Sequence, residues 1–139
     1  MANRLGDSVK LLDRLRAQPW ALPLARWVFW LTGVGVFIAA VIPKEDHPPD
    51  IFGWDKANHF AAFYTLGVLG AAAFPRVSLL VLGACLSGFG AAIELVQAIP
   101  FVHRDCDVWD WVTDTVGVLA ALCPLLLALW RRERQDPPV

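Results

Sequence analysis

The sequence predicts an all-α fold, a polytopic membrane helix bundle with about four transmembrane helices and a short N-terminal amphipathic helix. Three observations support this prediction. Of the 139 residues 57% are hydrophobic, and the mean hydropathy is +0.50. The apolar residues form long runs rather than short periodic stripes, which favours membrane spans over the core of a soluble protein. Runs of this length satisfy their backbone hydrogen bonds in lipid only as helices.

Each apolar run is close to the ~20 residues that cross the hydrocarbon core of a bilayer. Proline ends the first three runs, at Pro43, Pro75 and Pro100, and Arg131 ends the fourth. Proline cannot donate a backbone hydrogen bond and disfavours helix in the residue before it, so these positions fit helix ends. The four predicted spans are residues 24–42, 57–74, 77–99 and 111–130.

The segment before the first span is itself apolar at helical spacing, through Leu5, Val9, Leu12 and Leu15. A short amphipathic helix on the cytoplasmic leaflet is one reading, and a partly ordered tail is the other. The charged leader is long and shows no cleavage site, so the first span is expected to be retained. The predicted divisions are an interfacial segment at 1–22, one transmembrane domain at 23–131 and a cytoplasmic tail at 132–139.

The Lys and Arg residues set the orientation of the bundle. Nine of the twelve fall at the end that holds both termini and Arg76, and the other three fall at the opposite end. Cytoplasmic ends of membrane proteins carry the excess of Lys and Arg, so both termini are expected in the cytoplasm. The net charge of −1 lacks the basic excess that nucleic acid requires, and nucleic-acid binding is excluded. The three Cys residues have neither a disulfide pattern nor metal-ligand spacing.

Polar residues gather at the outer ends of three spans, although a charge at the centre of a membrane helix costs at least ~2.5 kcal/mol. Asp55 and His59 are four residues apart at the start of the second span, hence on one helix face. Glu94 and Gln97 are three apart near the end of the third span. The start of the fourth span carries a stripe with 3-4-3 spacing, formed by Asp107, Asp110, Asp114 and Gly117. Three helices are therefore expected to bring these groups to one depth.

Several of these residues have ordinary structural interpretations. Asp55 suits the N-terminus of a helix, where an acid meets free N–H groups. Lys56 suits a side chain that extends to the headgroups. Arg104 suits a surface ion pair with Asp107 or Asp110, which contributes little stability. His59 and Gln97 suit buried hydrogen bonds between helices. Glu94 and Asp114 are the hardest to explain in this way, because both lie inside spans and need partners.

At these positions the chain resembles the VanZ-like family of small bacterial membrane proteins. The likeness covers residues 55–117 and rests on three blocks in order: Asp55-Lys56-x-x-His59-Phe60, then Glu94-Leu95-x-Gln97, then Arg104-x-x-Asp107-x-x-Asp110-x-x-x-Asp114-x-x-Gly117. Asp114 departs from the pattern, which more often has Asn there. The resemblance implies a multi-pass protein of the bacterial cytoplasmic (inner) membrane, and its founding member is associated with resistance to the glycopeptide teicoplanin. It does not imply a particular reaction.

The first functional hypothesis is a membrane hydrolase or transferase that acts on a lipid or lipid-linked envelope substrate at the outer leaflet. His59 would be the base or nucleophile and Glu94 the general acid, with Asp110 as the third catalytic residue. The expected substrate-binding residues are Lys56, Gln97, Arg104 and Asp114. The expected structural or capping residues are Asp55, Asp107 and Gly117. The carboxylates suit a divalent metal as cofactor: oxygen ligands fit Mg²⁺, Ca²⁺ or Mn²⁺, and His59 would allow Zn²⁺.

Two other functions stay open. A non-catalytic module would bind an envelope component or a partner helix in the same pocket, and it would depend more on Arg104 than on Glu94. Proton or ion passage is disfavoured, because the inner halves of the spans carry no titratable group apart from Arg26 at the edge. The expected partners are membrane lipids and a lipid-linked substrate. The sequence does not determine the oligomeric state.

Overall fold

The computed structural model describes residues 18–43, 54–102, 104 and 106–135. This part of the chain is helical and contains no strand, which confirms the all-α prediction. Its elements in chain order are α2 (Ala21–Val41), α3 (Asp55–Ala73), α4 (Leu79–Gln97), the 3-10 turn η2 (Pro100–Val102) and α5 (Val108–Gln135). The amphipathic helix predicted on Leu5 to Leu15 lies outside the described residues. Of the predicted interfacial segment 1–22, residues 18–20 form a bend and a turn, and α2 begins at Ala21.

Three helices are long and apolar enough to cross a membrane: α2, α4 and the Val108–Arg131 part of α5. The fourth long helix, α3, has 19 residues, but Asp55, Lys56 and His59 lie in its first turns and lower its hydropathy. A helical membrane protein is therefore supported, and a crossing by α3 stays a prediction. α5 continues through Pro124, which lipid-embedded helices tolerate when neighbouring groups satisfy the freed carbonyl.

The outer surface of the bundle is strongly apolar. Leu31, Leu80 and Leu95 are 66%, 71% and 73% exposed, and Trp27 is 68% exposed. Soluble proteins rarely expose apolar residues over such wide areas. This surface fits a hydrocarbon solvent, in which an exposed leucine has no unfavourable contact with water.

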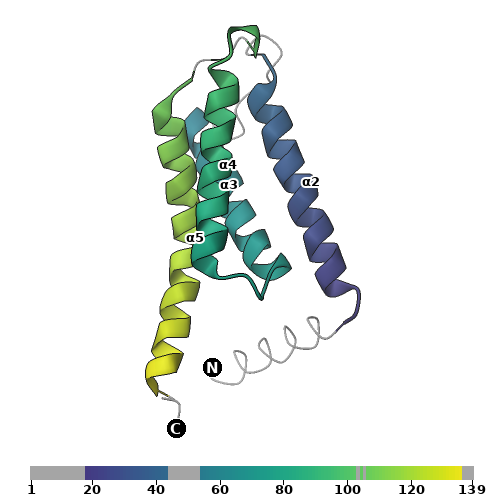
Figure 1. Cartoon of the computed structure of the whole chain (residues 1–139), viewed down its shortest axis with the longest axis vertical. Coiled ribbons are helices and arrows are strands. Elements are labelled where there is room, and N and C mark those ends of the chain that lie inside the picture. Colours follow the sequence, from purple (N-terminus) through teal and green to yellow (C-terminus); the bar gives the residue numbers. More distant parts are fainter. Residues whose placement is uncertain (1–17, 44–53, 103, 105, 136–139) are drawn as a thin grey trace.

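Consecutive helices run in opposite directions, and α3 contacts each of the other three (Figure 1). Its most extensive contact is with α5. The core reflects this central position, because Phe63, Leu66 and Ala73 of α3 are almost completely buried. Val118 and Leu122 of α5 pack into the same cluster. The helix with the most polar N-terminus is thus also the helix around which the bundle is built.

Helices α3 and α5 approach closely because glycine lies at their contacts. A Cβ atom on Gly117 would lie 2.6 Å from the carbonyl oxygen of Phe60, and one on Gly67 would lie 2.8 Å from the Cβ atom of Ala121. Small residues allow this approach between helices in lipid, where van der Waals packing and not the hydrophobic effect drives association. We call the contact at Phe60, Gly67, Gly117 and Ala121 the α3–α5 interface.

The alternating directions place the start of α3, the end of α4 and the start of α5 at one end of the bundle, opposite the C-terminus (Figure 1). The other end holds cationic side chains. There Arg26 donates from Nε to the carbonyl oxygen of Ala73 at 3.3 Å, and its guanidinium lies 5.8 Å from the ring centre of Phe74. The two ends therefore differ in chemistry, as the distribution of charges in the sequence predicts.

Candidate functional site

A group of seven ionisable side chains lies where α3 starts, α4 ends and α5 starts. Spacing explains the pairs: Asp55 and His59 are one helical turn apart on α3, and Asp110 and Asp114 are one turn apart on α5. Because consecutive helices alternate in direction, α3 and α5 run the same way and both start at this end, so the two pairs face each other. We call this group the polar cluster, and its members are Asp55, Lys56, His59, Glu94, Asp107, Asp110 and Asp114.

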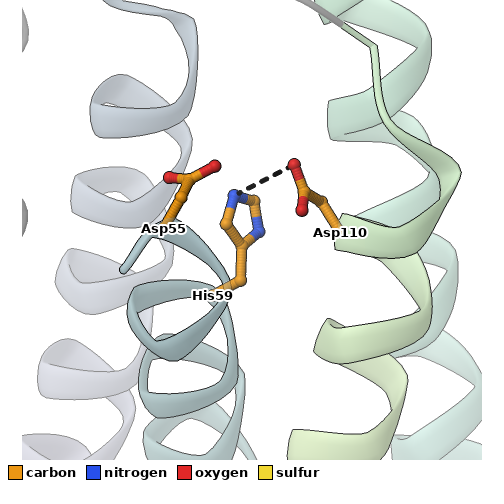
Figure 2. Close-up of side chains that lie close together, drawn as sticks. All are labelled: Asp55, His59 and Asp110. Atoms are coloured by element: carbon orange, nitrogen blue, oxygen red, sulfur yellow. Dashed lines mark ion pairs between the residues drawn. The ribbon is translucent and has the colours of Figure 1, made fainter. Parts of the chain in front are cut away.

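The most buried contact of the polar cluster joins His59 to Asp114. The His59 Nδ1 atom lies 2.9 Å from Asp114 Oδ1, the Asp114 side chain is fully buried and His59 is 11% exposed. The other ring nitrogen, Nε2, faces Asp110, whose Oδ2 is 3.9 Å away. Figure 2 shows the His59 ring extending from α3 between Asp55 and Asp110. A hydrogen bond from Nδ1 to Asp114 fixes the ring orientation and leaves Nε2 for another partner.

Gly90 of α4 makes room for the Asp114 carboxylate. A Cβ atom at this position would lie 2.9 Å from Asp114 Oδ2 and 3.4 Å from the Phe63 ring. Sequence reasoning missed this residue. Its signal is the spacing of four to Glu94, which puts a residue without a side chain on the same helix face as a buried acid. Asp114 thus fits between α3 and α4 only because α4 has glycine there.

Lys56 binds two carboxylates at the start of α5. Its Nζ atom lies 2.7 Å from Asp107 Oδ2 and 2.7 Å from Asp110 Oδ1. The hydrogen bond from the Lys56 ammonium lowers the pKa of Asp107, and the hydrogen bond from the backbone N–H of Trp109 lowers it further. Asp107 also caps α5, because its Oδ1 accepts that N–H bond at 2.9 Å. The Lys56 side chain therefore lies across the α3–α5 contact rather than pointing to headgroups.

Glu94 and Gln97 of α4 are both buried, but they point to different neighbours. Glu94 Oε2 accepts a 3.0 Å hydrogen bond from the backbone N–H of Asp107, which holds the start of α5 against α4. Gln97 Nε2 donates to the carbonyl oxygen of Ala40 at 2.9 Å, and so ties α4 to the end of α2. Within the described ranges, Glu94 Oε1, Gln97 Oε1 and Asp114 Oδ2 are buried atoms with no hydrogen-bond partner. The structure thus places Gln97 at the α2–α4 contact and Glu94 beside the cluster.

The remaining predicted residues have different surroundings. Asp55 is the first residue of α3, where its charge meets the positive end of the helix, and no side chain caps this helix at Trp54. Gly117 lies in the α3–α5 interface. Arg104 is half-buried in the segment between η2 and α5, and it makes no hydrogen bond or ion pair with the described residues. The structure therefore does not join Arg104 to Asp107 or Asp110.

Asp55, His59 and Asp110 are placed to hold a metal ion. Each offers one ligand atom, and these atoms all lie within 4.8 Å of one another (Figure 2). The sequence assigned Asp55 a structural role, whereas the geometry groups it with His59 and Asp110. The spacing of four to His59 already indicated that the two side chains share a face. Comparisons with protein families, with curated proteins and with solved structures each found no match.

Proposed function

We propose that the chain is a VanZ-like protein of the bacterial cytoplasmic membrane, with a polar site at the outer surface that acts on a lipid or lipid-linked envelope substrate. In this proposal both termini are cytoplasmic and α3 crosses the membrane as the fourth span. The excess of Lys and Arg at the opposite end supports this orientation. A role in tolerance to teicoplanin would be a consequence of altered envelope lipids.

The observation that carries this proposal is the contact between His59 and the buried Asp114. Nδ1 lies against a carboxylate with no solvent exposure, so the ring has one orientation and Nε2 is the nitrogen left for chemistry. A hydrogen-bonded acid also raises the basicity of the imidazole. A surface histidine would need no such support. The contact favours a reactive or ligand-binding role for Nε2 over a purely structural one.

Hydrolysis would use this nitrogen in a simple sequence of proton transfers. Nε2 takes a proton from a water molecule while the water oxygen forms a bond to the phosphorus or carbonyl carbon of the substrate. The bond to the leaving oxygen then breaks, and the proton on Nε2 passes to that oxygen. In a transferase an acceptor hydroxyl replaces the water. Lys56 lies 2.7 Å from two carboxylates beside the ring and offsets part of their negative charge, which lowers the repulsion of an anionic headgroup.

An apolar groove supports a substrate with a hydrocarbon tail. It encloses about 340 Å³ between α2, α3 and α4, near the lower limit of ordinary ligand pockets. Its lining includes Phe29, Gly33, Phe37, Leu66, Leu86 and Phe89. Phe89 precedes Glu94 by five residues, or about 8 Å along the helix, and its ring lies 5.9 Å from that of Phe63. Since Phe63 also borders Gly90 beside Asp114, the groove and the polar cluster are separated by one layer of side chains.

The test uses the full-length protein in nanodiscs. Phosphatidylglycerol and a polyprenyl pyrophosphate are added in separate reactions, and products are separated by mass spectrometry. We expect turnover of one class by the wild type, and loss of turnover on His59→Ala. Arg76→Gln is the control, because it removes an exposed charge from the opposite end of the bundle. Retention of lipid without any product would favour the binding module, and equal turnover by His59→Ala would refute the proposed chemistry.

A further inference from the structure

We propose that Asp55, His59 and Asp110 form a binding site for a divalent transition-metal cation, with Zn²⁺ as the ion best suited to the ligands. The imidazole nitrogen favours a transition metal, zinc also accepts carboxylate oxygens, and three protein ligands leave a position for water. The site lies between α3 and α5 at the end of the bundle (Figure 2). The proposal does not depend on the identity of the substrate. With a cation bound, Nε2 would hold the metal and the proton transfer assigned to Nε2 under the proposed function would not occur there, because a ring nitrogen that binds a cation has no lone pair left for a proton.

The distances fit an ion rather than direct contact. All three ligand atoms lie within 4.8 Å of one another, and His59 Nε2 is 3.9 Å from Asp110 Oδ2. This gap is too long for a hydrogen bond. A cation that lies about 2.0–2.2 Å from each ligand atom would fill it. Ligand atoms of a tetrahedral ion are about 3.3–3.6 Å apart, so the three side chains would close by a fraction of an ångström or more around a bound cation.

Two neighbours orient the ligands without occupying the ligand positions. Asp114 engages His59 at Nδ1, so Nε2 faces the site. Lys56 engages Asp110 at Oδ1, so Oδ2 faces His59. A carboxylate behind a ligating histidine is the usual support of a zinc site, because it fixes the ring and strengthens the ligand. His59 and Asp110 are thus each held through one atom, and each directs a second atom toward the proposed metal site.

Buried carboxylates beside the ligands give a further indication of a missing positive charge. Asp114 Oδ2 is buried and has no hydrogen-bond partner in the part of the chain that the structure describes. Glu94 is 6% exposed and lies close enough to His59 and Asp110 to interact with both electrostatically. Buried negative charges are costly unless they are paired or near a cation. A divalent ion at the proposed site would supply the charge.

Metal binding is measured directly on the full-length protein, purified in detergent with a tag free of histidine and treated with EDTA. Zn²⁺ is titrated by calorimetry, and bound metal is counted by mass spectrometry after gel filtration. Substitution of Cys85, Cys106 and Cys123 by Ser removes thiols that would bind zinc elsewhere. We expect one equivalent of Zn²⁺ per chain, and at least ~10-fold weaker binding of Mg²⁺, which prefers oxygen ligands.

The informative variants are Asp55→Asn and its matched control Asp107→Asn. Each removes one charge from the cluster, but only Asp55 belongs to the proposed ligand set. Asp55→Asn and His59→Ala should each weaken Zn²⁺ binding at least ~10-fold, and Asp107→Asn should keep one equivalent. Circular dichroism establishes that each variant is helical. A wild-type protein that binds no Zn²⁺ would overturn the inference, as would undiminished binding by the Asp55 and His59 variants.

The outcome is separable from that of the proposed function. Stoichiometric Zn²⁺ with no lipid turnover would support the metal site and refute the enzyme. Lipid turnover that depends on His59 but persists in EDTA, with no Zn²⁺ bound, would support the enzyme and refute the metal site.

Discussion

Gly117→Ala should loosen the α3–α5 interface. The added Cβ atom would lie 2.6 Å from the carbonyl oxygen of Phe60, about 0.8 Å short of the 3.4 Å at which ordinary contact begins. Both sides of this contact belong to helix backbones, so no side chain can turn away. The two helices must separate, and overpacking of this kind costs about 1–3 kcal/mol. A loss of about 2 kcal/mol lowers the ratio of folded to unfolded protein by roughly 30-fold.

Gly88→Ala is the matched control for this experiment. Gly88 is an exposed residue of α4, and a Cβ atom added there would have no neighbouring atom within 4 Å, so the substitution adds only helix propensity. That gain is up to ~1 kcal/mol. Unfolding is followed by tryptophan fluorescence during titration with SDS in mixed micelles. Gly117→Ala should unfold at lower SDS than wild type and Gly88→Ala at equal or higher SDS. Equal stability of the two variants would refute the argument from close approach.

Three further substitutions test single contacts of the structure. Gln97→Ala leaves the Ala40 carbonyl oxygen without its donor and should lower the free energy of unfolding by about 1–3 kcal/mol; an unchanged SDS midpoint would contradict this. Lys56→Met leaves Asp110, whose side chain is 8% exposed, without its ammonium partner. The substitution should destabilise the protein by about 1–3 kcal/mol. Adding Asp110→Asn should restore part of this stability, and a further loss of stability would refute the pairing. Gly33→Phe fills the apolar groove and should reduce crosslinking to a phospholipid with a photoactivatable acyl chain, while Zn²⁺ binding stays unchanged; undiminished crosslinking would exclude the groove as the acyl site.

The helices were predictable because each is an apolar run that ends in a recognisable signal. The prediction for α5 was residues 111–130 and the helix is Val108–Gln135, so its end differs by five residues and its start by three. The prediction counted apolar residues from Trp111, whereas the capping side chain of Asp107 lets the helix begin three residues earlier. Hydropathy measures where a helix enters lipid, and capping sets where the helix begins. The two positions differ wherever polar residues occupy the first turn.

The members of the polar cluster were predictable from face and depth, but their pairings were not. Spacing placed Asp110 and Asp114 on one stripe of α5 without saying which of them would meet His59. That choice depends on the rotation and height of α5 against α3, which the backbone contact at Gly117 sets. The partner of Gln97 was likewise not predictable. Gln97 lies three residues after Glu94 on α4, and the turn of the helix between them directs Gln97 toward α2. Helical periodicity gives neighbours within one helix, and packing decides the neighbours between helices.

Asp114 offers the sharpest test of how the buried carboxylate acts. Asn has the same shape, and its amide oxygen can accept the hydrogen bond from His59 Nδ1, so Asp114→Asn should keep the ring orientation and one equivalent of Zn²⁺. It removes the negative charge behind the ring, and loss of such a supporting carboxylate weakens metal binding by ~10–100-fold. Asp114→Leu removes the hydrogen bond too and should abolish stoichiometric binding. If Asn and Leu behave alike, orientation is not what Asp114 contributes. If Asn binds as tightly as wild type, the charge of Asp114 is irrelevant, and the 2.9 Å contact acts by orienting the ring alone.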